Sequence, residues 1–161
     1  MFFNNNIFLK NQDYILKIND RKEEKTKELF EIINEKNIDI KPYKNIKFIT
    51  DCVMKNFKKS DKIFLLWLYF FGEHINLNFG SKWALLKYDA PFLSEFYYPV
   101  LIDKKEEIWF VGTDCARAYF KYNKLNQIDF SGFYKVTAER IIYSPNLKDI
   151  QGKLKDFIVL D

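Results

Sequence analysis

The sequence has few cysteines and histidines, the residues that link parts of a fold through disulfide bonds or metal ions. Its 161 residues include two cysteines, five glycines, four prolines and one histidine. Cys52 and Cys115 can form at most one disulfide bond, and their spacing matches no metal or redox motif. We therefore expect free thiols in a reducing compartment. With His74 as the only histidine, the chain offers little for imidazole catalysis or metal ligation.

The sequence also lacks an apolar run long enough to cross a membrane. Spanning a bilayer takes about 20 predominantly apolar residues, and the run from Ile63 to Phe71 ends at the Gly-Glu-His of residues 72–74. Residues 1–12 have no basic n-region, no adequate apolar core and no small-residue cleavage site, so they do not resemble a secretory signal. We expect a protein without membrane association, located in the cytoplasm.

The composition that is present favours one compact domain over residues 1–161. Hydrophobic residues make up 48% of the chain and charged residues 30%, which is enough apolar material to offset the chain entropy lost on folding. No internal repeat and no linker rich in Gly or Ser divides it. The net charge of +4 permits an anionic partner but falls short of a dedicated polycation.

The clearest predicted element is a helix over residues 61–79. Ser60 or Asp61 can cap its N-terminus, and Gly80 can end it in a left-handed conformation. Its apolar residues recur at intervals of four and make a wide face, so this helix has to be buried. We expect Trp67, Phe70 and Phe71 to lie in the core, beneath the sheet formed further along the chain.

Before residue 61, local patterns predict one short extended segment and two helices. Residues 13–18 alternate in polarity, which indicates a short strand or extended arm. Asp20 and Glu23 resemble a capping box for a helix over residues 21–36, whose first half is almost wholly charged and should be solvated. Leu29, Phe30, Ile32 and Ile33 are its docking residues. A second amphipathic helix is predicted over residues 42–58, antiparallel to the helix that follows.

Beyond Gly80 the pattern changes to strands. Residues 83–88, 96–102 and 107–111 are predicted strands, and the charged turn of residues 103–106 makes the last two a hairpin. Pro99 lacks a backbone donor, so its strand should lie at an edge or carry a bulge.

The remainder of the chain completes an α+β fold. A short helix through residues 115–123 is expected to be capped by Thr113 or Asp114, and further strands are expected at 133–136, 140–143 and 155–160. The fold class is therefore α+β, with N-terminal helices packed on a C-terminal, mostly antiparallel sheet.

An enzyme is one reading of the chain, although no motif for nucleotide binding or for a nucleophile elbow occurs. A Cys115 thiolate near a helix N-terminus, with His74 as its base, is one hypothesis, and a pair of carboxylates is another. The acidic pairs at residues 23–24 and 106–107 have the character of surface charge. We expect no cofactor and no metal site.

Nucleic-acid binding is an alternative reading of residues 117–124. Arg117, Lys121 and Lys124 line one face at helical spacing, and Tyr119 and Phe120 lie between them, as in a stacking surface. The same aromatic residues can equally pack inward while the basic residues face solvent.

A set of spaced residues from about 65 to 120 resembles small bacterial domains of unknown function. Those domains have an apolar helix with Gly-Glu near its end, a Gly-x-x-Trp strand and a Tyr-Pro-Val hairpin strand. The matching residues are Gly72, Glu73, Gly80, Trp83, Tyr98, Pro99 and Val100. Several such domains are associated with toxin systems as immunity-like proteins, and the resemblance implies no catalytic residues.

A protein-binding domain, of the kind that neutralises a toxin by direct binding, is therefore our leading hypothesis. Such a domain needs a wet, charged contact face. The hairpin around Lys104, Lys105 and Trp109 is one candidate for this face, and Arg117 and Lys121 on the following helix are further candidate partner-binding residues.

Overall fold

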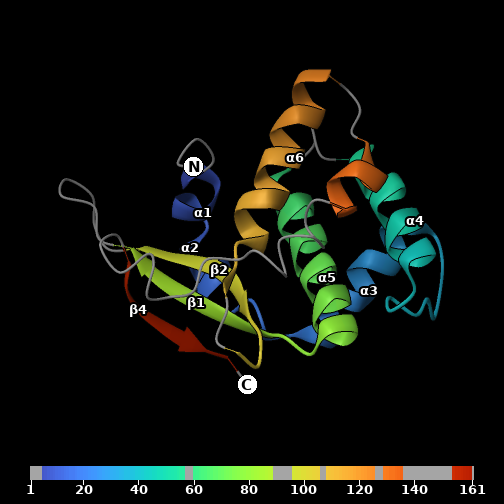
Figure 1. The fold of residues 1–161 in the computed structure, drawn as a ribbon. Coiled ribbons are helices and arrows are strands. Elements are labelled where there is room, and N and C mark those ends of the chain that lie inside the picture. The colour runs from blue at the N-terminus through green and yellow to red at the C-terminus, as the bar shows by residue number, and fades with distance from the viewer. Residues whose placement is uncertain are drawn as a thin grey trace.

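The fold combines a helical N-terminal part with one antiparallel sheet (Figure 1). The computed structural model describes residues 5–56, 60–88, 96–105, 108–125, 129–135 and 154–160. The helices are α1 (Asn5–Lys10), α2 (Gln12–Leu16), α3 (Lys22–Ile33), α4 (Tyr43–Met54), α5 (Asp61–Phe79) and α6 (Val111–Leu125), and the strands are β1 (Lys82–Tyr88), β2 (Phe96–Ile102), β3 (Ile108–Trp109) and β4 (Leu154–Val159). This is the predicted α+β class, with helices ahead of the sheet.

Helix α5 has the predicted bounds, and its two ends explain why. The Ser60 hydroxyl accepts a hydrogen bond from the Lys62 backbone N–H at 3.0 Å, which satisfies one of the unpaired donors at a helix N-terminus. Gly80 follows the last turn at φ 70°, where a residue without a Cβ is cheapest. The apolar run between these signals leaves α5 buried from Phe64 to Gly72.

The core prediction for α5 is confirmed in burial and corrected in direction. Trp67 and Phe71 are fully buried and Phe70 is 3% exposed. Trp67 Nε1 donates to Thr50 Oγ1 of α4 at 2.9 Å, and Phe71 packs on Phe133 in a helical segment at residues 130–135. The Trp67 and Phe71 side chains therefore face other helices and do not lie beneath the sheet.

A different side of α5 meets the sheet. The Tyr69 ring stacks on Trp83 of β1, with ring centroids 6.3 Å apart. A Cβ added to Gly72 would lie 2.2 Å from the same indole, so the absence of a side chain at this position lets β1 approach the helix. The Trp83 indole N–H donates to Glu73 Oε1 at 2.9 Å. These residues of the Gly-Glu and Gly-x-x-Trp pattern therefore make one packing unit.

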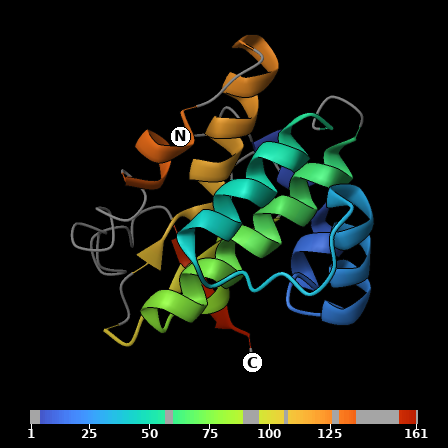
Figure 2. The same ribbon diagram turned by 90° about the vertical axis from the view of Figure 1, so that its right-hand side faces the viewer.

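Helices α4 and α5 lie side by side in both views (Figures 1 and 2). They run antiparallel as predicted, because the chain just before α4 contacts the second half of α5 while its later part contacts the first half. The contacts are Ile40 with His74 and Thr50 with Trp67. Helix α4 begins after Pro42 and ends at Met54, and the linking residues 57–59 lie outside the described part of the chain.

The described strands form a sheet in the order β3-β2-β1-β4 with every neighbouring pair antiparallel. Strand β1 pairs along its full length with β2, from Lys82 opposite Ile102 to Tyr88 opposite Phe96. The predicted hairpin of β2 and β3 is present, although β3 pairs only through Ile108 and Trp109. The expected strand at residues 140–143 lies outside the described residues.

Pro99 lies in a part of β2 that β3 does not pair with, as its missing donor requires. β3 covers only Leu101 and Ile102 of this strand. At Tyr97 the side-chain amide of Gln12 replaces a strand, because its Nε2 donates to the Tyr97 carbonyl at 2.9 Å and its Oε1 accepts from the Tyr97 N–H at 2.7 Å. Backbone groups alternate between the two edges of a strand, so Pro99 has its nitrogen on the same outer side as Tyr97. No bond to β1 is lost.

Two predicted strands are helical in the structure. Residues 12–16 form α2, because Ile15 and Ile18 are both fully buried at a spacing of three, whereas Leu16, on the supposed apolar side of the alternation, is 42% exposed. Residues 133–135 belong to the helical segment that packs on Phe71. In both places a helical spacing of apolar residues outweighs an apparent alternation.

The predicted capping box of α3 is also wrong. The N-cap residue is Arg21, in the left-handed region at φ 57°, and no side chain caps the helix. Leu29 and Ile33 dock the helix as predicted, and so does Lys25, which is 8% exposed. The charged first half of α3 is thus not wholly solvated. Helix α6 begins at Val111, so Thr113 and Asp114 lie within the helix and do not precede its first residue as the prediction required.

Candidate functional site

The predicted hairpin residues meet the C-terminal end of α5 and form a mixed apolar and basic surface. We call this the hairpin surface and define it as Leu77 and Phe79 of α5 with Lys104 and Lys105 of the β2–β3 turn. The two elements touch, since a Cβ added to Gly80 would lie 3.6 Å from Lys104 Cε. The left-handed turn at Gly80 directs the chain from α5 into β1, which brings the helix end beside the hairpin (Figure 1).

Two large apolar side chains of the hairpin surface are open to solvent. Leu77 is 51% exposed and Phe79 is 40% exposed, although they belong to a helix that is buried from Phe64 to Gly72. Single exposed apolar residues are common on proteins. Here two of them lie in the last turn of one helix, on different sides of it because they are two residues apart.

Trp109 lies beneath this surface and is not part of its exposed face. It is 4% exposed, and the Phe79 ring covers it with ring centroids 5.5 Å apart. Trp109 is therefore not exposed on the contact face, and its part in partner binding stays a prediction. Trp109 pairs with Leu101, which in turn pairs with Trp83. Paired residues point to the same face of a sheet, so Trp109 shares with Trp83 the face on which α5 packs.

The Trp109 indole nitrogen is buried and has no hydrogen-bond partner among the described residues. A buried donor without an acceptor costs about 1–3 kcal/mol, and such a group in a native fold calls for an explanation. Its position under Phe79 places this unsatisfied donor in contact with the hairpin surface.

Several exposed lysines lie on elements near the end of α5. Lys104 and Lys105 are exposed in the turn, and exposed Lys82 pairs with Ile102, the last residue before that turn. Lys41 is exposed too, and its carbonyl accepts from Asn78 Nδ2 at 2.8 Å. Cations are favourable near a helix C-terminus. The nearby Asp39 and Asp103 carboxylates each accept a backbone N–H of the local turn.

Arg117 and Lys121 lie elsewhere. Both are exposed on α6, which leads away from the hairpin, so that its later turns and the Lys104 turn lie at opposite ends of the molecule in both views (Figures 1 and 2). Tyr119 between them packs on Phe64 with ring centroids 4.6 Å apart and donates to Asp61. This aromatic residue is therefore used in packing. The side chains of Phe120 and Lys124 lie outside the described residues.

The cysteine hypothesis does not fit the structure. Cys115 is fully buried, and burial raises the pKa of its thiol well above the ordinary value. A buried neutral thiol is a poor nucleophile. Cys52 is partly buried, and burial raises the pKa of its thiol as well. Both cysteines are free thiols, as predicted.

His74 is a core histidine with both ring nitrogens engaged. Its Nδ1 lies 2.6 Å from the Ile40 carbonyl, which can only accept, so Nδ1 carries the proton. Its Nε2 then accepts from the Tyr134 hydroxyl at 2.9 Å. Burial lowers the pKa of His74, which favours this neutral form. The histidine thus joins α5 to the chain before α4 and to the 130–135 segment.

Lys25 is a buried charge that the sequence analysis missed. Its Nζ donates to the Ile18 carbonyl and lies over the rings of Tyr14 and Tyr69, at 5.0 and 4.2 Å from their centroids. Burial lowers its pKa to about 8, although Asp20 and Glu73 oppose that shift. The spacing of Lys25, Leu29 and Ile33 at intervals of four was the available signal.

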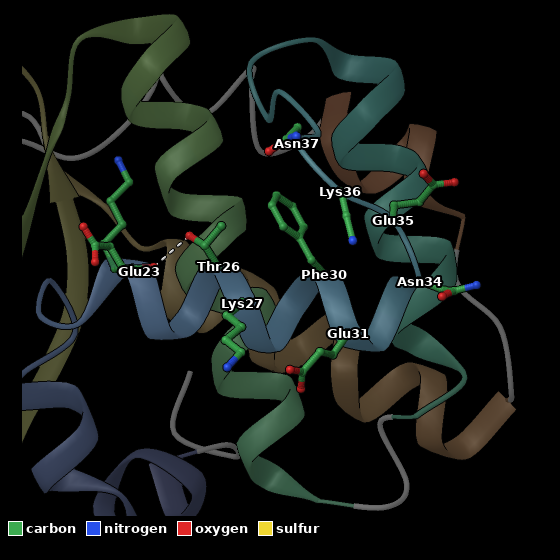
Figure 3. A pocket seen from close by; sticks show the side chains of 10 residues that line it. Glu23, Thr26, Lys27, Phe30, Glu31, Asn34, Glu35, Lys36 and Asn37 are labelled. Atoms are coloured by element: carbon green, nitrogen blue, oxygen red, sulfur yellow. Dashed lines mark hydrogen bonds between the residues drawn. The ribbon is translucent and has the colours of Figure 1, made fainter.

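A shallow hollow runs along α3 and the loop after it (Figure 3). Phe30 points from the helix toward Asn37 in that view. The rest of the lining is exposed or partly exposed and carries balanced charge, from Lys22, Lys27 and Lys36 and from Glu23, Glu31 and Glu35. We interpret the hollow as the solvated outer face predicted for this helix, since nothing in it selects one kind of ligand.

The described residues contain no group of three or more His, Cys, Asp or Glu side chains that could hold a metal ion. Within the same part of the chain, no helix combines the length and the apolar character needed to cross a membrane. No protein-family model, no curated protein and no solved structure matches this sequence.

Proposed function

We propose that this protein is a cytoplasmic protein-binding domain that neutralises a partner by covering part of its surface, in the manner of an immunity protein. The observation that carries the proposal is the exposure of Leu77 and Phe79 in the last turn of a largely buried helix whose end adjoins Lys104 of the hairpin turn. An apolar centre within a polar rim is the usual anatomy of a protein interface.

The chemistry of the hairpin surface points to an acidic partner. Lys41, Lys82, Lys104 and Lys105 are exposed on elements near the end of α5, and the chain as a whole carries a net charge of +4. Complementary charge speeds the encounter of two proteins and excludes partners of like charge. An immunity protein with this surface binds a toxin that presents carboxylates around an apolar patch.

The motif resemblance agrees with a binding role and adds no chemistry. Gly72, Glu73 and Trp83 serve the packing of α5 on β1, and Gly80 ends the helix. None of these residues is poised for catalysis. The resemblance thus supports a scaffold whose exposed surface carries the function.

The test is capture of partners from native cell extract, together with purified products of neighbouring genes. The double variant Leu77→Ser with Phe79→Ser is compared with Leu16→Ser and Phe48→Ser, whose side chains are each 42% exposed elsewhere on the protein. We expect the hairpin variant to lose at least about tenfold in affinity for the purified partner, or about 1.4 kcal/mol, and the control to bind as wild type. Equal binding by the two variants would refute the proposed surface.

Nucleic-acid binding is the alternative that the same experiment separates. Exposed Arg117 and Lys121, one helical turn apart, can contact phosphate. Affinity would then fall steeply with salt, and Lys121→Ala would lower the salt slope by about one unit. Captured nucleic acid with that behaviour would replace the protein-binding proposal.

A further inference from the structure

The two outer edges of the sheet differ in how far other described residues cover their backbone groups. At the β2 side, β3 covers the end of the strand, Gln12 occupies the Tyr97 backbone and Pro99 removes a donor. Gly112 of α6 closes in on the same stretch, since a Cβ there would lie 2.8 Å from the Pro99 carbonyl oxygen. Proteins protect exposed strand edges in such ways because an open edge pairs with other chains.

The opposite edge, β4, has no such protection among the described residues. The strand pairs with β1 on one side, and it is the last strand in the sheet order. The Leu160 N–H donates to the Trp83 carbonyl at 2.8 Å, so residue 160 faces β1. Because backbone groups alternate, residues 158 and 156 also face β1, while Phe157 and Val159 direct their N–H and C=O groups outward.

We propose that the outer edge of β4 accepts an extended segment of the partner protein as an added strand. This inference rests on the proposed function and specifies how the partner is held. Strand addition supplies main-chain hydrogen bonds to an open sheet edge, and neighbouring side chains then determine specificity. Outward groups at alternate residues of β4 are the pattern that an added strand requires.

The position of β4 connects this edge to the hairpin surface. Val159, which is 44% exposed, pairs with Ala84, two residues from Lys82. Lys82 in turn lies opposite Ile102 at the start of the hairpin turn. The open edge and the basic, apolar surface therefore lie at the same end of the sheet, where one partner can engage both.

Charge favours a partner protein over a second copy of this chain as the added strand. Each copy has a net charge of +4, and net charge of one sign opposes self-association. An acidic partner segment beside β4 has the opposite interaction, since exposed Lys82 lies on the neighbouring strand at the same end of the sheet. The occupant we assign is thus an extended, acidic segment.

Val159→Pro tests the assignment with little disturbance of the fold. The outward N–H of residue 159 makes no bond to β1, and proline is tolerated at such edge positions. We expect Val159→Pro to keep the wild-type circular dichroism spectrum and to bind the purified partner at least about tenfold more weakly. In the matched variant Ile158→Pro the lost N–H faces β1, so we expect the melting temperature to fall.

Amide hydrogen exchange supplies a measurement that needs no variant. Adding the partner to the wild-type protein should slow exchange at Phe157 and Val159 relative to the free protein. Unchanged exchange at both amides, or wild-type affinity in folded Val159→Pro, would overturn the inference even if the Leu77 and Phe79 variant had lost binding. A wild-type dimer, formed without partner and abolished by Val159→Pro, would overturn it by making a second copy the occupant.

Discussion

The two parts of α5 differ in how far their apolar side chains are buried. From Phe64 to Gly72 every side chain is buried, and His74 and Ile75 continue the core. One turn later Leu77 and Phe79 are exposed beside lysines. Apolar residues in the first part are explained by folding, because they fill the space between α4, the 130–135 segment and β1. Leu77 and Phe79 in the last turn remain exposed, although Phe79 also covers Trp109, and this exposure is why we propose that they bind a partner.

Truncation in the buried part should have the largest effect. Phe71→Ala removes a fully buried ring that packs on Phe133 and Trp67, and we expect a loss of about 3–5 kcal/mol from lost burial and the cavity left behind. That loss approaches the whole stability of an ordinary domain, about 5–15 kcal/mol. Chemical denaturation measures it, with soluble expression as a first screen.

Lys105→Ala is the control for that truncation. Its exposed side chain should contribute less than about 0.5 kcal/mol to folding. If Phe71→Ala melted at the wild-type temperature and lost only partner binding, the buried and exposed parts of α5 would have to exchange their assigned roles.

A methyl group added to the sheet-facing side of α5 should have the next largest effect. Gly72→Ala places a Cβ 2.2 Å from the Trp83 ring, so helix and strand must separate. Alanine is the better helix former by about 1 kcal/mol, but overpacking costs about 1–3 kcal/mol or more. We expect net destabilisation in urea, together with a change in tryptophan fluorescence. A stabilised Gly72→Ala would show that β1 does not depend on this close approach.

The charge buried against α5 predicts how stability changes in mild alkali. Lys25 has its pKa lowered from 10.5 to about 8 by burial, so between these values the unfolded chain binds more protons than the folded one. The free energy of unfolding should therefore rise from pH 8 toward pH 10, by about 2 kcal/mol. Above pH 10 the trend should reverse, because burial raises the pKa values of Tyr14 and Tyr69.

Urea denaturation at several pH values measures that slope. Lys25→Met removes the titrating group and should flatten the curve below pH 10. A slope that survives in this variant would assign the effect to other residues.

The smallest effect is expected at Gly80, where α5 ends and the chain turns into β1. Gly80→Ala forces a side chain into the left-handed region at φ 70°, which costs about 1 kcal/mol. The nearest side-chain atom, Lys104 Cε at 3.6 Å, leaves room for the methyl group. We expect a small drop in melting temperature with partner affinity retained. A loss of affinity instead would mean that the angle at Gly80 positions the hairpin surface.

Much of the fold could be predicted from the sequence where local signals agree. Helix α5 has a capping serine, a continuous apolar run and a terminal glycine, and its bounds are as predicted. The strand and helix patterns at residues 13–18 compete, and tertiary burial of Ile15 and Ile18 decided for the helix. Such a choice depends on contacts with distant parts of the chain, which a local pattern does not contain.

The candidate site was predicted only in part, for a related reason. The charged turn with Lys104 and Lys105 is exposed as expected, because turns between strands lie on the surface. The place of Trp109 depends on Phe79, thirty residues earlier in the chain, which covers it. The apolar spacing of residues 61–79 predicts burial of one wide face, and the exposure of Phe79 was not predicted.

The Gln12 amide on the β2 edge has a consequence for the order of folding. Gln12 and Tyr97 are 85 residues apart, and a loop of this length is entropically costly to close before the sheet exists. Helices α1 and α2, although they precede β2 in the chain, therefore have their docking site completed only after β2 has been made. We therefore expect these helices to pack late in folding, on a sheet that has already formed.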